Sequence, residues 1–226
     1  MQYNQTKNQK KAVVLLSGGQ DSTTCLFWAI KNFSSVVAVG FNYGQRHSKE
    51  LTCAREICVE AGIELKIFDL PLLGQITKSA LTDSNIKPDA IDENIGEPNT
   101  LVENRNMLFL TYAATYAKSI GAFDLVTGVS QADCSGYPDC RERFIKSLEI
   151  TLSLSMDCAI NIHTPLMHLS KAKVWKLAKV LGALDVVRFK TLTCYNGQIS
   201  EGCGACKACS LRDAGFKEFM RLETSE

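Results

Sequence analysis

The sequence predicts an α/β fold: a Rossmann-like, five-stranded parallel sheet in the strand order 3-2-1-4-5, with helices on both faces. Three observations predict it. Short β-rich runs alternate with helical patterns along residues 12–182, which is typical of βαβ crossovers. A glycine pair follows the first run, at the strand end where open parallel sheets bind ligands. Four cysteines in the last quarter of the chain predict a small C-terminal metal-binding segment.

Each strand is predicted from an apolar, β-branched run or from alternation with period two. The predicted strands cover residues 12–16, 36–41, 63–70, 123–129 and 160–166. The predicted helices cover 22–32, 48–62, 103–121, 139–156 and 170–182, with Ser170 as an N-cap and Gly62 and Gly182 as helix ends. Residues 71–100 are rich in Pro, Asp, Asn and Ser, which predicts a long surface excursion that is functional or mobile.

Composition and charge exclude several classes of partner. The net charge of +1 gives no excess that would attract nucleic acid or an anionic membrane. No apolar run approaches the roughly 20 residues that span a bilayer, and the polar first eleven residues lack the apolar stretch of a secretory signal. Ten cysteines in such a chain indicate a reduced, cytoplasmic protein with a metal site rather than a disulfide framework.

Residues 17–24, which read SGGQDSTT, join the first strand to the first helix. Two glycines allow a sharp turn and a close approach of the backbone to a ligand. The next helix offers free N–H groups and a positive dipole end, which suit phosphate. Hydroxyl groups surround Asp21, a candidate ligand for magnesium or acceptor from a backbone amide. The lysine of the G-x-x-x-x-G-K-[ST] loop is missing. The alternative is a glycine turn that binds nothing.

This loop resembles the S-G-G-x-D-S loop of the PP-loop ATP pyrophosphatases, a superfamily that adenylates a carbonyl or carboxyl oxygen and releases pyrophosphate. The resemblance implies ATP as the nucleotide. It also implies that the residues around the ATP phosphates are Leu16, Ser17, Gly18, Gly19, Gln20, Asp21, Ser22 and Thr23.

Four cysteines, three of them spaced C-x-x-C-x-x-C, form a candidate metal site: Cys194, Cys203, Cys206 and Cys209. Four thiolates satisfy a tetrahedral Zn²⁺, and a site filled by protein favours a structural role. Such a site would fasten the C-terminal tail to the domain and contribute to folding. The alternative is an iron–sulfur cluster, because the spacing also occurs in ferredoxin-like runs. The other six cysteines are expected to be mostly small buried hydrophobes.

Further stretches carry a more specific resemblance: FNYGQRHSKEL at 41–51, GVSQADCSGYPDCRERFI at 128–145, TPLMHLSKAKVWKLA at 164–178 and TLTCYNG at 191–197. With the loop and the four cysteines, they are similar to the 7-cyano-7-deazaguanine synthase family from about Lys11 to Phe216. The resemblance implies a homodimeric ligase that forms carbon–nitrogen bonds in queuosine biosynthesis, with ATP, Mg²⁺ and Zn²⁺. It places a nucleotide-binding and catalytic domain at 11–190 and a zinc-binding segment, packed on it, at 191–220.

The implied reaction converts 7-carboxy-7-deazaguanine and ammonia to the nitrile. A carboxylate is a poor electrophile and hydroxide is a poor leaving group, and adenylation corrects both faults. Ammonia then displaces AMP to give an amide, whose oxygen must leave after a second activation. The loop type favours AMP and pyrophosphate as products over ADP and phosphate.

The resemblance also implies roles for single residues. The candidate catalytic residues are Asp21, Arg105, which would hold the reacting carboxylate, and Lys171, which would neutralise phosphate charge. The candidate substrate-binding residues are Tyr43, Gln45, Arg46, Asn106, Asp133, Ser135, Gly136, Tyr137, Asp139 and Arg141. Within this set, Tyr137 is expected to stack on a purine-like ring, and an aspartate at 133 or 139 to accept from its guanine-like edge.

Each cation has a plainer alternative. The alternative for Arg46 is a solvated surface position, and the alternative for Lys171 is an ordinary surface position. The alternative for Arg105 is an ion pair with Glu103 or Asp124. The residues before Arg105 also depart from the family, which often has V-P-G-R-N where this chain reads VENRN at 102–106. Asn is the residue next best to Gly at a positive φ, so Asn104 is expected to preserve the turn.

Two other functions fit parts of the pattern. Another PP-loop adenylating enzyme, such as a tRNA sulfur transferase, would need an iron–sulfur cluster or a reactive thiol and a surface for RNA. A non-catalytic ATP-binding module with a zinc site would leave the polar YGQRH and SGYPDCR segments without a role.

Overall fold

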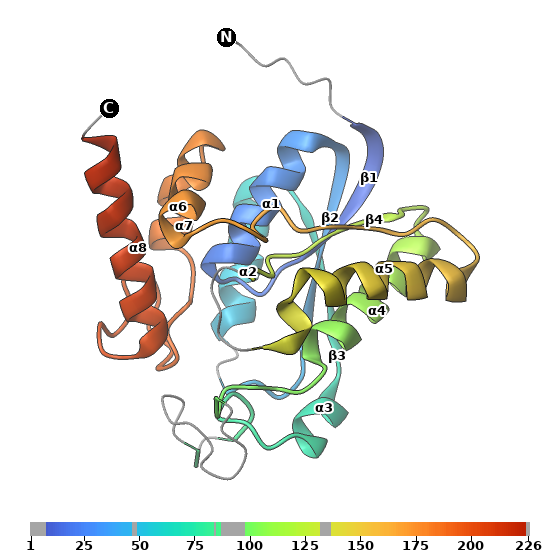
Figure 1. Cartoon of the computed structure of the whole chain (residues 1–226), viewed down its shortest axis with the longest axis horizontal. Helices are drawn as coiled ribbons and strands as arrows, with labels where there is room; N and C mark the ends of the chain where they lie inside the picture. Colours follow the sequence, from blue (N-terminus) through green and yellow to red (C-terminus); the bar gives the residue numbers. More distant parts are fainter. Residues whose placement is uncertain (1–7, 47–48, 84, 87–97, 132–136, 225–226) are drawn as a thin grey trace.

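The computed structural model describes residues 8–46, 49–83, 85–86, 98–131 and 137–224 (Figure 1). Strands and helices alternate along most of the chain, as the sequence predicts. In chain order they are β1 (Asn8–Leu15), α1 (Gln20–Asn32), β2 (Phe33–Asn42), α2 (Lys49–Ala61), β3 (Glu64–Asp69), α3 (Pro71–Ile76), α4 (Arg105–Ser119), β4 (Asp124–Val126), the 3-10 helix η1 (Pro138–Cys140), α5 (Glu142–Met156), β5 (Asn161–His163), α6 (Lys171–Val180), α7 (Leu184–Phe189) and α8 (Lys207–Glu223).

The five strands form one parallel sheet in the order β3-β2-β1-β4-β5, which confirms the predicted order. The central strand, β1, pairs with β2 on one side and with β4 on the other. The direction of strand succession reverses between β1 and β4. Ligands of open α/β sheets bind at such a switch point, beyond the carboxyl ends of the strands.

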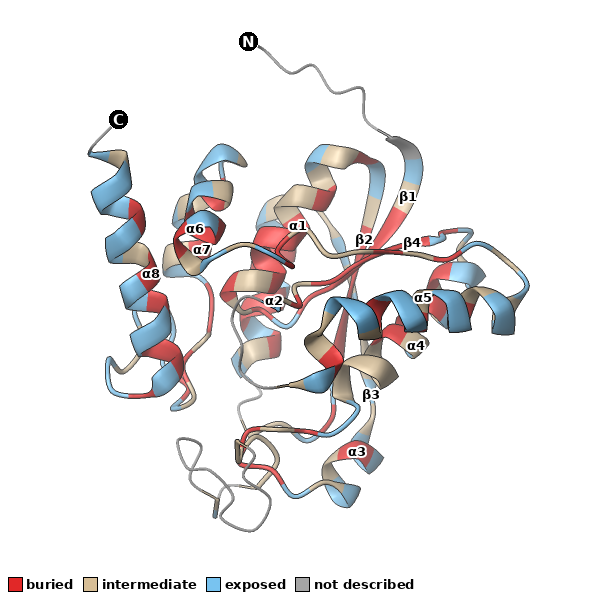
Figure 2. Ribbon diagram, in the orientation of Figure 1, coloured by how far each residue is buried: buried red, intermediate tan, exposed pale blue. Residues whose placement is uncertain are grey.

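Side-chain alternation along β1 divides the core between the two faces of the sheet. Ala12 and Val14 pack in one buried cluster with residues of α1 and α2, whereas Val13 and Leu15 pack in a second cluster with residues of α4 and α5. Both faces are therefore covered by helices, as predicted, which explains why β1 contains a continuous apolar run. Figure 2 shows this buried strand between its helical layers.

Strands β4 and β5 are shorter than predicted. The chain leaves the sheet after Val126, because the residues from Thr127 to Ser130 line a cavity instead of continuing the strand. The predicted helix at 139–156 is also divided, since Pro138 begins a 3-10 turn and α5 starts only at Glu142. Helix α3 occupies the start of the predicted excursion at 71–100, of which 84 and 87–97 lie outside the described residues.

The predicted elements include neither α7 nor α8. For α8 the reason is that the cysteine spacing indicates a metal-binding loop, whereas the first turn of this helix contains one of those cysteines, Cys209. Helix α8 packs on α6, where Trp175 meets Phe216 with ring centroids 5.0 Å apart. Cys194 and Cys206 belong to the same buried cluster as Leu16 of the loop. Within the described part of the chain, no helix has the length and apolar character needed to cross a membrane.

Candidate active site

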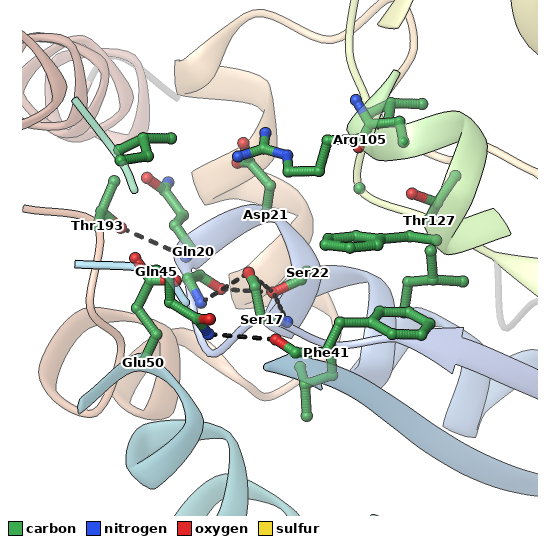
Figure 3. Close-up of a pocket in the computed structure, with 18 of the residues that line it drawn as sticks. Ser17, Gln20, Asp21, Ser22, Phe41, Gln45, Glu50, Arg105, Thr127 and Thr193 are labelled. Atoms are coloured by element: carbon green, nitrogen blue, oxygen red, sulfur yellow. Dashed lines mark hydrogen bonds between the residues drawn. The ribbon is translucent and has the colours of Figure 1, made fainter. Parts of the chain in front are cut away.

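A cavity of about 340 Å³ lies at the carboxyl ends of β1, β2 and β4, the position expected for a ligand. Figure 3 shows that side chains from well-separated segments surround it. Its polar wall includes Ser17, Gly19, Gln20, Asp21, Ser22, Gln45, Glu50, Arg105, Asn106, Thr127, Ser130, Tyr137 and Thr193. Its apolar wall includes Phe41, Tyr43 and Phe109.

The two loop glycines serve different purposes. Gly18 has a φ of +87°, and a Cβ there would lie 2.3 Å from the carbonyl oxygen of Glu50, so only glycine fits. Gly19 has a φ of −86° and is the N-cap of α1, without a side-chain capping bond. A Cβ on Gly19 would touch nothing within 3.4 Å, so glycine is not required there by packing. Its missing side chain instead leaves the N-terminus of α1 accessible to a ligand.

Hydroxyl groups of the loop form a local network. The Oγ atoms of Ser17 and Ser22 lie 3.0 Å apart, and the backbone N–H of Ser17 donates to Ser22 Oγ at 3.2 Å. Thr23 is fully buried, and its hydroxyl has no partner among the described residues. The backbone N–H of Gln20 donates to Thr193 Oγ1 at 3.4 Å, which joins the loop to the segment before the cysteines.

Asp21 and Lys171 form an ion pair across 150 residues of sequence. Lys171 Nζ lies 2.8 and 3.0 Å from the two carboxylate oxygens of Asp21. Lys171 also packs against α8, where a Cβ on Gly215 would lie 2.4 Å from its Cβ. With a side chain only 17% exposed, it is not the ordinary surface lysine of the alternative interpretation.

Arg105 is the first residue of α4, where Asn104 has a φ of 58°, which confirms the expected left-handed turn. Its Nη1 donates to the Tyr43 hydroxyl at 3.5 Å. Burial lowers the pKa of Arg105, but Tyr43 and other neighbours outweigh this effect and raise it above its ordinary value. Asp124, the alternative ion-pair partner, bonds instead to His163 Nε2 at 2.8 Å.

Asp139 caps the same helix. Its carboxylate accepts from the backbone N–H of Asn106 at 2.9 Å and from the Asn106 side-chain amide at 3.1 Å. Asp139 therefore holds the residue after Arg105 in place.

Tyr137 lies beside this helix cap in the sequence, and its hydroxyl hydrogen-bonds to Thr100 Oγ1 at 2.5 Å. Burial is the main cause that raises the pKa of Tyr137.

The remaining candidate substrate residues fall into three groups. Gln45 lines the cavity and braces the end of β2, because its amide donates to Phe41 O at 3.2 Å and accepts from Tyr43 N–H at 2.9 Å. Arg46 donates to Ile86 O at 3.4 Å, and Arg141 precedes α5; neither lines the cavity. Three others lie outside the described residues: Asp133, Ser135 and Gly136.

Sequence reasoning missed four polar residues of the cavity wall, which are Glu50, Thr127, Ser130 and Thr193. Burial raises the pKa of Glu50 to about 7, although Arg105 partly opposes this shift. Glu50 lies within the stretch at 41–51 that carries the family resemblance and at the start of the helix that follows the second strand, but neither feature assigned it a role. Thr193 lies within the similar stretch at 191–197, and its position at the cavity depends on the fold of the C-terminal segment.

The four clustered cysteines come together as predicted. Their Sγ atoms all lie within 4.8 Å of one another, so they can hold a metal ion. Asn196 donates to two of these sulfurs, at 3.3 Å from its backbone N–H to Cys194 and at 3.2 Å from its side chain to Cys203. Three of the scattered cysteines are buried as expected: Cys25, Cys53 and Cys58. Cys140 and Cys158 are partly buried, and Cys134 lies outside the described residues.

Comparison with known proteins gives the family. The family model described as Queuosine biosynthesis protein QueC matches residues 11–220. The chain is 54% identical over 215 residues to the 7-cyano-7-deazaguanine synthase of Clostridium acetobutylicum, and 53% identical over 215 residues to that of Clostridium novyi. Each alignment covers 95% of this chain and 97% of the relative.

A solved structure, NMN synthetase from Francisella tularensis, shares the fold with a TM-score of 0.50 and 18% identity, over 79% of this chain and 64% of that one. This likeness extends to the fold alone. The family match covers the loop, the cavity and the cysteine cluster together. The chain belongs to the queuosine biosynthesis protein QueC family.

Proposed function

We propose that this chain converts 7-carboxy-7-deazaguanine and ammonia to 7-cyano-7-deazaguanine at the expense of ATP, as a ligase of queuosine biosynthesis. Relatives at 53–54% identity carry the name of that synthase. The observation that carries the proposal is the cavity, which joins a PP-loop, the guanidinium of Arg105 and an aromatic wall at one switch point, with Lys171 paired to Asp21 of its lining.

The loop would bind the ATP phosphates through the open N-terminus of α1 and the hydroxyls of Ser17 and Ser22. Lys171, held by Asp21, would neutralise charge on the leaving pyrophosphate. Arg105 would hold the reacting carboxylate against the α-phosphate, because a guanidinium binds carboxylates in a fixed, bidentate geometry. The first adenylation yields an acyl adenylate, a mixed anhydride from which ammonia displaces AMP to give the amide. The second adenylation activates the amide oxygen, which leaves as AMP while the nitrogen loses its protons, so that the nitrile, AMP and pyrophosphate are the products.

The aromatic wall fits a flat, purine-like ring. Phe41 and Phe109 are stacked, with centroids 4.4 Å apart, and Tyr43 tilts against Phe109 at 5.4 Å. Tyr137 is proposed to close this wall over the deazaguanine. The carboxylate of Asp139 is already engaged by Asn106, which leaves Asp133 as the proposed acceptor from the guanine-like edge.

Zn²⁺ is the ion we propose for the four cysteines. A single tetrahedral ion with Zn–S bonds of about 2.3 Å separates its sulfurs by about 3.8 Å. The spacings of 3.4 Å from Cys206 to Cys209 and 3.9 Å from Cys203 to Cys209 suit such an ion. An iron–sulfur cubane binds each thiolate to a different iron and spreads the sulfurs further apart, which also disfavours the tRNA sulfur transferase alternative. Mg²⁺ is proposed to arrive with ATP, with phosphates as its main ligands.

We further propose that residues 11–190 and 191–220 act as one unit in a cytoplasmic homodimer. The proposed reducing compartment would keep the thiols reduced, and no disulfide joins any two of the nine described cysteines. Size-exclusion chromatography with light scattering tests the dimer.

One incubation tests the central proposal. The purified protein is mixed with ATP, Mg²⁺, ammonium and 7-carboxy-7-deazaguanine, and the products are followed by mass spectrometry. A nitrile together with AMP is the expected result. If the amide accumulates and no nitrile forms, the second activation is contradicted. If folded and metallated protein does not consume the acid, 7-carboxy-7-deazaguanine is not the substrate.

A further inference from the structure

Glu50 is an acidic side chain in the cavity that the proposed reaction has not used. It lies in the first turn of α2, whose backbone touches the phosphate loop through the contact between Glu50 O and Gly18. Its side chain projects into the cavity near Gln45 (Figure 3). It is therefore close to where the phosphates and the reacting carbon would lie.

The surroundings of Glu50 differ from those of the buried aspartates. Asp124 and Asp139 each accept hydrogen bonds from neighbouring side chains. No hydrogen bond or ion pair joins the Glu50 carboxylate to any of the residues that the structure describes. A half-buried carboxylate without a donor loses hydration that nothing in the described protein replaces, so a ligand is expected to supply the donor.

The negative charge of Glu50 favours one of the substrates of the proposed reaction as that ligand. ATP and the carboxylic acid are both anions, and a carboxylate beside them raises their binding free energy. Among the substrates of the proposed reaction, only ammonium is a cation. Ammonium must also lose a proton before its nitrogen becomes a nucleophile. A carboxylate at this place serves both needs, by attracting the cation and by accepting its proton.

We propose that Glu50 binds the ammonium ion and acts as the general base that converts it to ammonia, an inference that rests on the proposed function. One N–H proton passes to a Glu50 oxygen, and the freed lone pair attacks the carbonyl carbon of the adenylated acid. The carbon–oxygen bond to AMP then breaks, and AMP leaves with the electron pair. The new amide nitrogen loses one further proton to water, and Glu50 releases its own proton to water before the next turnover.

The environment of Glu50 supports a base that works near neutral pH. The groups that face it are Arg105 from α4 and Tyr43 from the end of β2, with Cys53 on its own helix. Asp21 lies across the cavity and is paired with Lys171. Burial outweighs the attraction of Arg105, so the Glu50 pKa of about 7 exceeds its ordinary value. The ammonium-dependent rate should accordingly fall as the pH drops through 7.

The test compares two nitrogen nucleophiles in the wild type and in Glu50→Gln. Hydroxylamine exists largely as the neutral base at neutral pH and needs no prior deprotonation; it traps the adenylated acid as a hydroxamate. We expect Glu50→Gln to lower kcat/KM for ammonium about 10²- to 10⁴-fold. The decrease of the ammonium-dependent rate at acid pH should disappear in this variant. Its rate of hydroxamate formation and its dependence on Mg²⁺ concentration should equal those of the wild type. Glu56→Gln, the same change on the exposed side of α2, is the matched control and should match the wild type.

The outcomes separate this inference from the proposed function. A wild type that forms neither amide nor hydroxamate refutes the function itself. A wild type that forms both, beside a Glu50→Gln variant with unchanged ammonium kinetics, refutes only the role of Glu50. Equal losses for both nucleophiles, or a shifted Mg²⁺ dependence, would also overturn it in favour of adenylation or metal binding. If Glu50→Gln fails to fold, Glu50→Ala with added formate replaces it, and restored ammonium-dependent turnover is expected.

Discussion

Two arginines, the partly buried Arg105 and the buried Arg212, show that the same side chain can have different roles. Arg212 of α8 is 5% exposed and makes four hydrogen bonds of 2.8–3.0 Å, to Thr191 Oγ1, Thr193 Oγ1 and the carbonyl oxygens of residues 187 and 188. Among the residues that the structure describes, the Arg105 guanidinium makes one long hydrogen bond, to the Tyr43 hydroxyl at 3.5 Å. Burial lowers the pKa of Arg212 to about 10, whereas the pKa of Arg105 is raised.

The difference in hydrogen bonding distinguishes an arginine that stabilises the fold from one that is available to a ligand. A guanidinium with its donors filled by its own chain fixes that chain in place. Arg212 fixes residues 191–193, and Leu192 N–H in turn donates to Gly18 O at 2.9 Å in the phosphate loop. A guanidinium that keeps donors free at a cavity wall is prepared for an anionic ligand. Residues 191–193, fixed by Arg212, therefore support the loop, whereas Arg105 leaves donors available to a ligand in the cavity.

The largest expected effect is on the structural side, in the cysteine cluster. Cys206→Ser removes one of four metal ligands and should lose the metal and thermal stability together. The destabilisation should be on the order of 5 kcal/mol, a part of the roughly 10–16 kcal/mol that structural zinc contributes in small domains. Metal analysis and thermal unfolding measure it, with Cys158→Ser as the control. A Cys206→Ser protein that stays metallated and equally stable would show that the four cysteines do not form one site.

Arg212→Met should destabilise the fold by about 3–5 kcal/mol, because it leaves several buried acceptors without a donor. It should also weaken ATP binding, since Thr193 and Leu192 would lose their anchor beside the loop. Chemical unfolding and ATP titration measure the two effects. Unchanged ATP affinity in the folded variant would mean that residues 191–193 do not support the loop.

Arg105→Lys should have the opposite pattern, with stability nearly unchanged and turnover lowered by roughly 10²- to 10³-fold, about 2.7–4 kcal/mol. Lysine keeps the charge but loses the planar, two-pronged geometry. Steady-state kinetics and ATP titration separate the effects. If ATP binding falls as much as turnover, Arg105 binds the nucleotide rather than the acid.

The smallest effect is expected where the turn positions Arg105. Asn104 has a φ of 58°, where glycine carries no Cβ penalty, so Asn104→Gly should be tolerated within about 1 kcal/mol. Asn104→Val should destabilise by about 1–2 kcal/mol, since a β-branched residue strains there. Thermal unfolding of both variants measures the difference. Equal stabilities would show that the turn relaxes and does not fix the start of α4.

The parts of the site that came from the sequence are contiguous. The phosphate loop and the cysteine spacing are local patterns whose geometry follows from glycine conformation and from ligand number. Glu50, Thr193 and Arg212 gave no such signal, because each acts on a segment that is distant in sequence. Asp139, named with Asp133 as a candidate acceptor for the guanine-like edge, also caps α4, a role that its local sequence does not indicate.

By itself the sequence determined the fold class, the strand order, the phosphate loop and the four-cysteine cluster. Periodicity and short motifs encode the elements, the loop and the cysteine spacing, since each depends on nearby residues. The strand order follows from the doubly wound arrangement that alternating strands and helices adopt. Only the tertiary structure decided which polar groups are satisfied. The pairing of Asp21 with Lys171, the filled donors of Arg212 and a Glu50 carboxylate that bonds to none of the described residues result from packing α2, α6 and α8 around one strand end. Burial and distance, which no local pattern specifies, separate the groups that hold this protein together from those left open to a ligand.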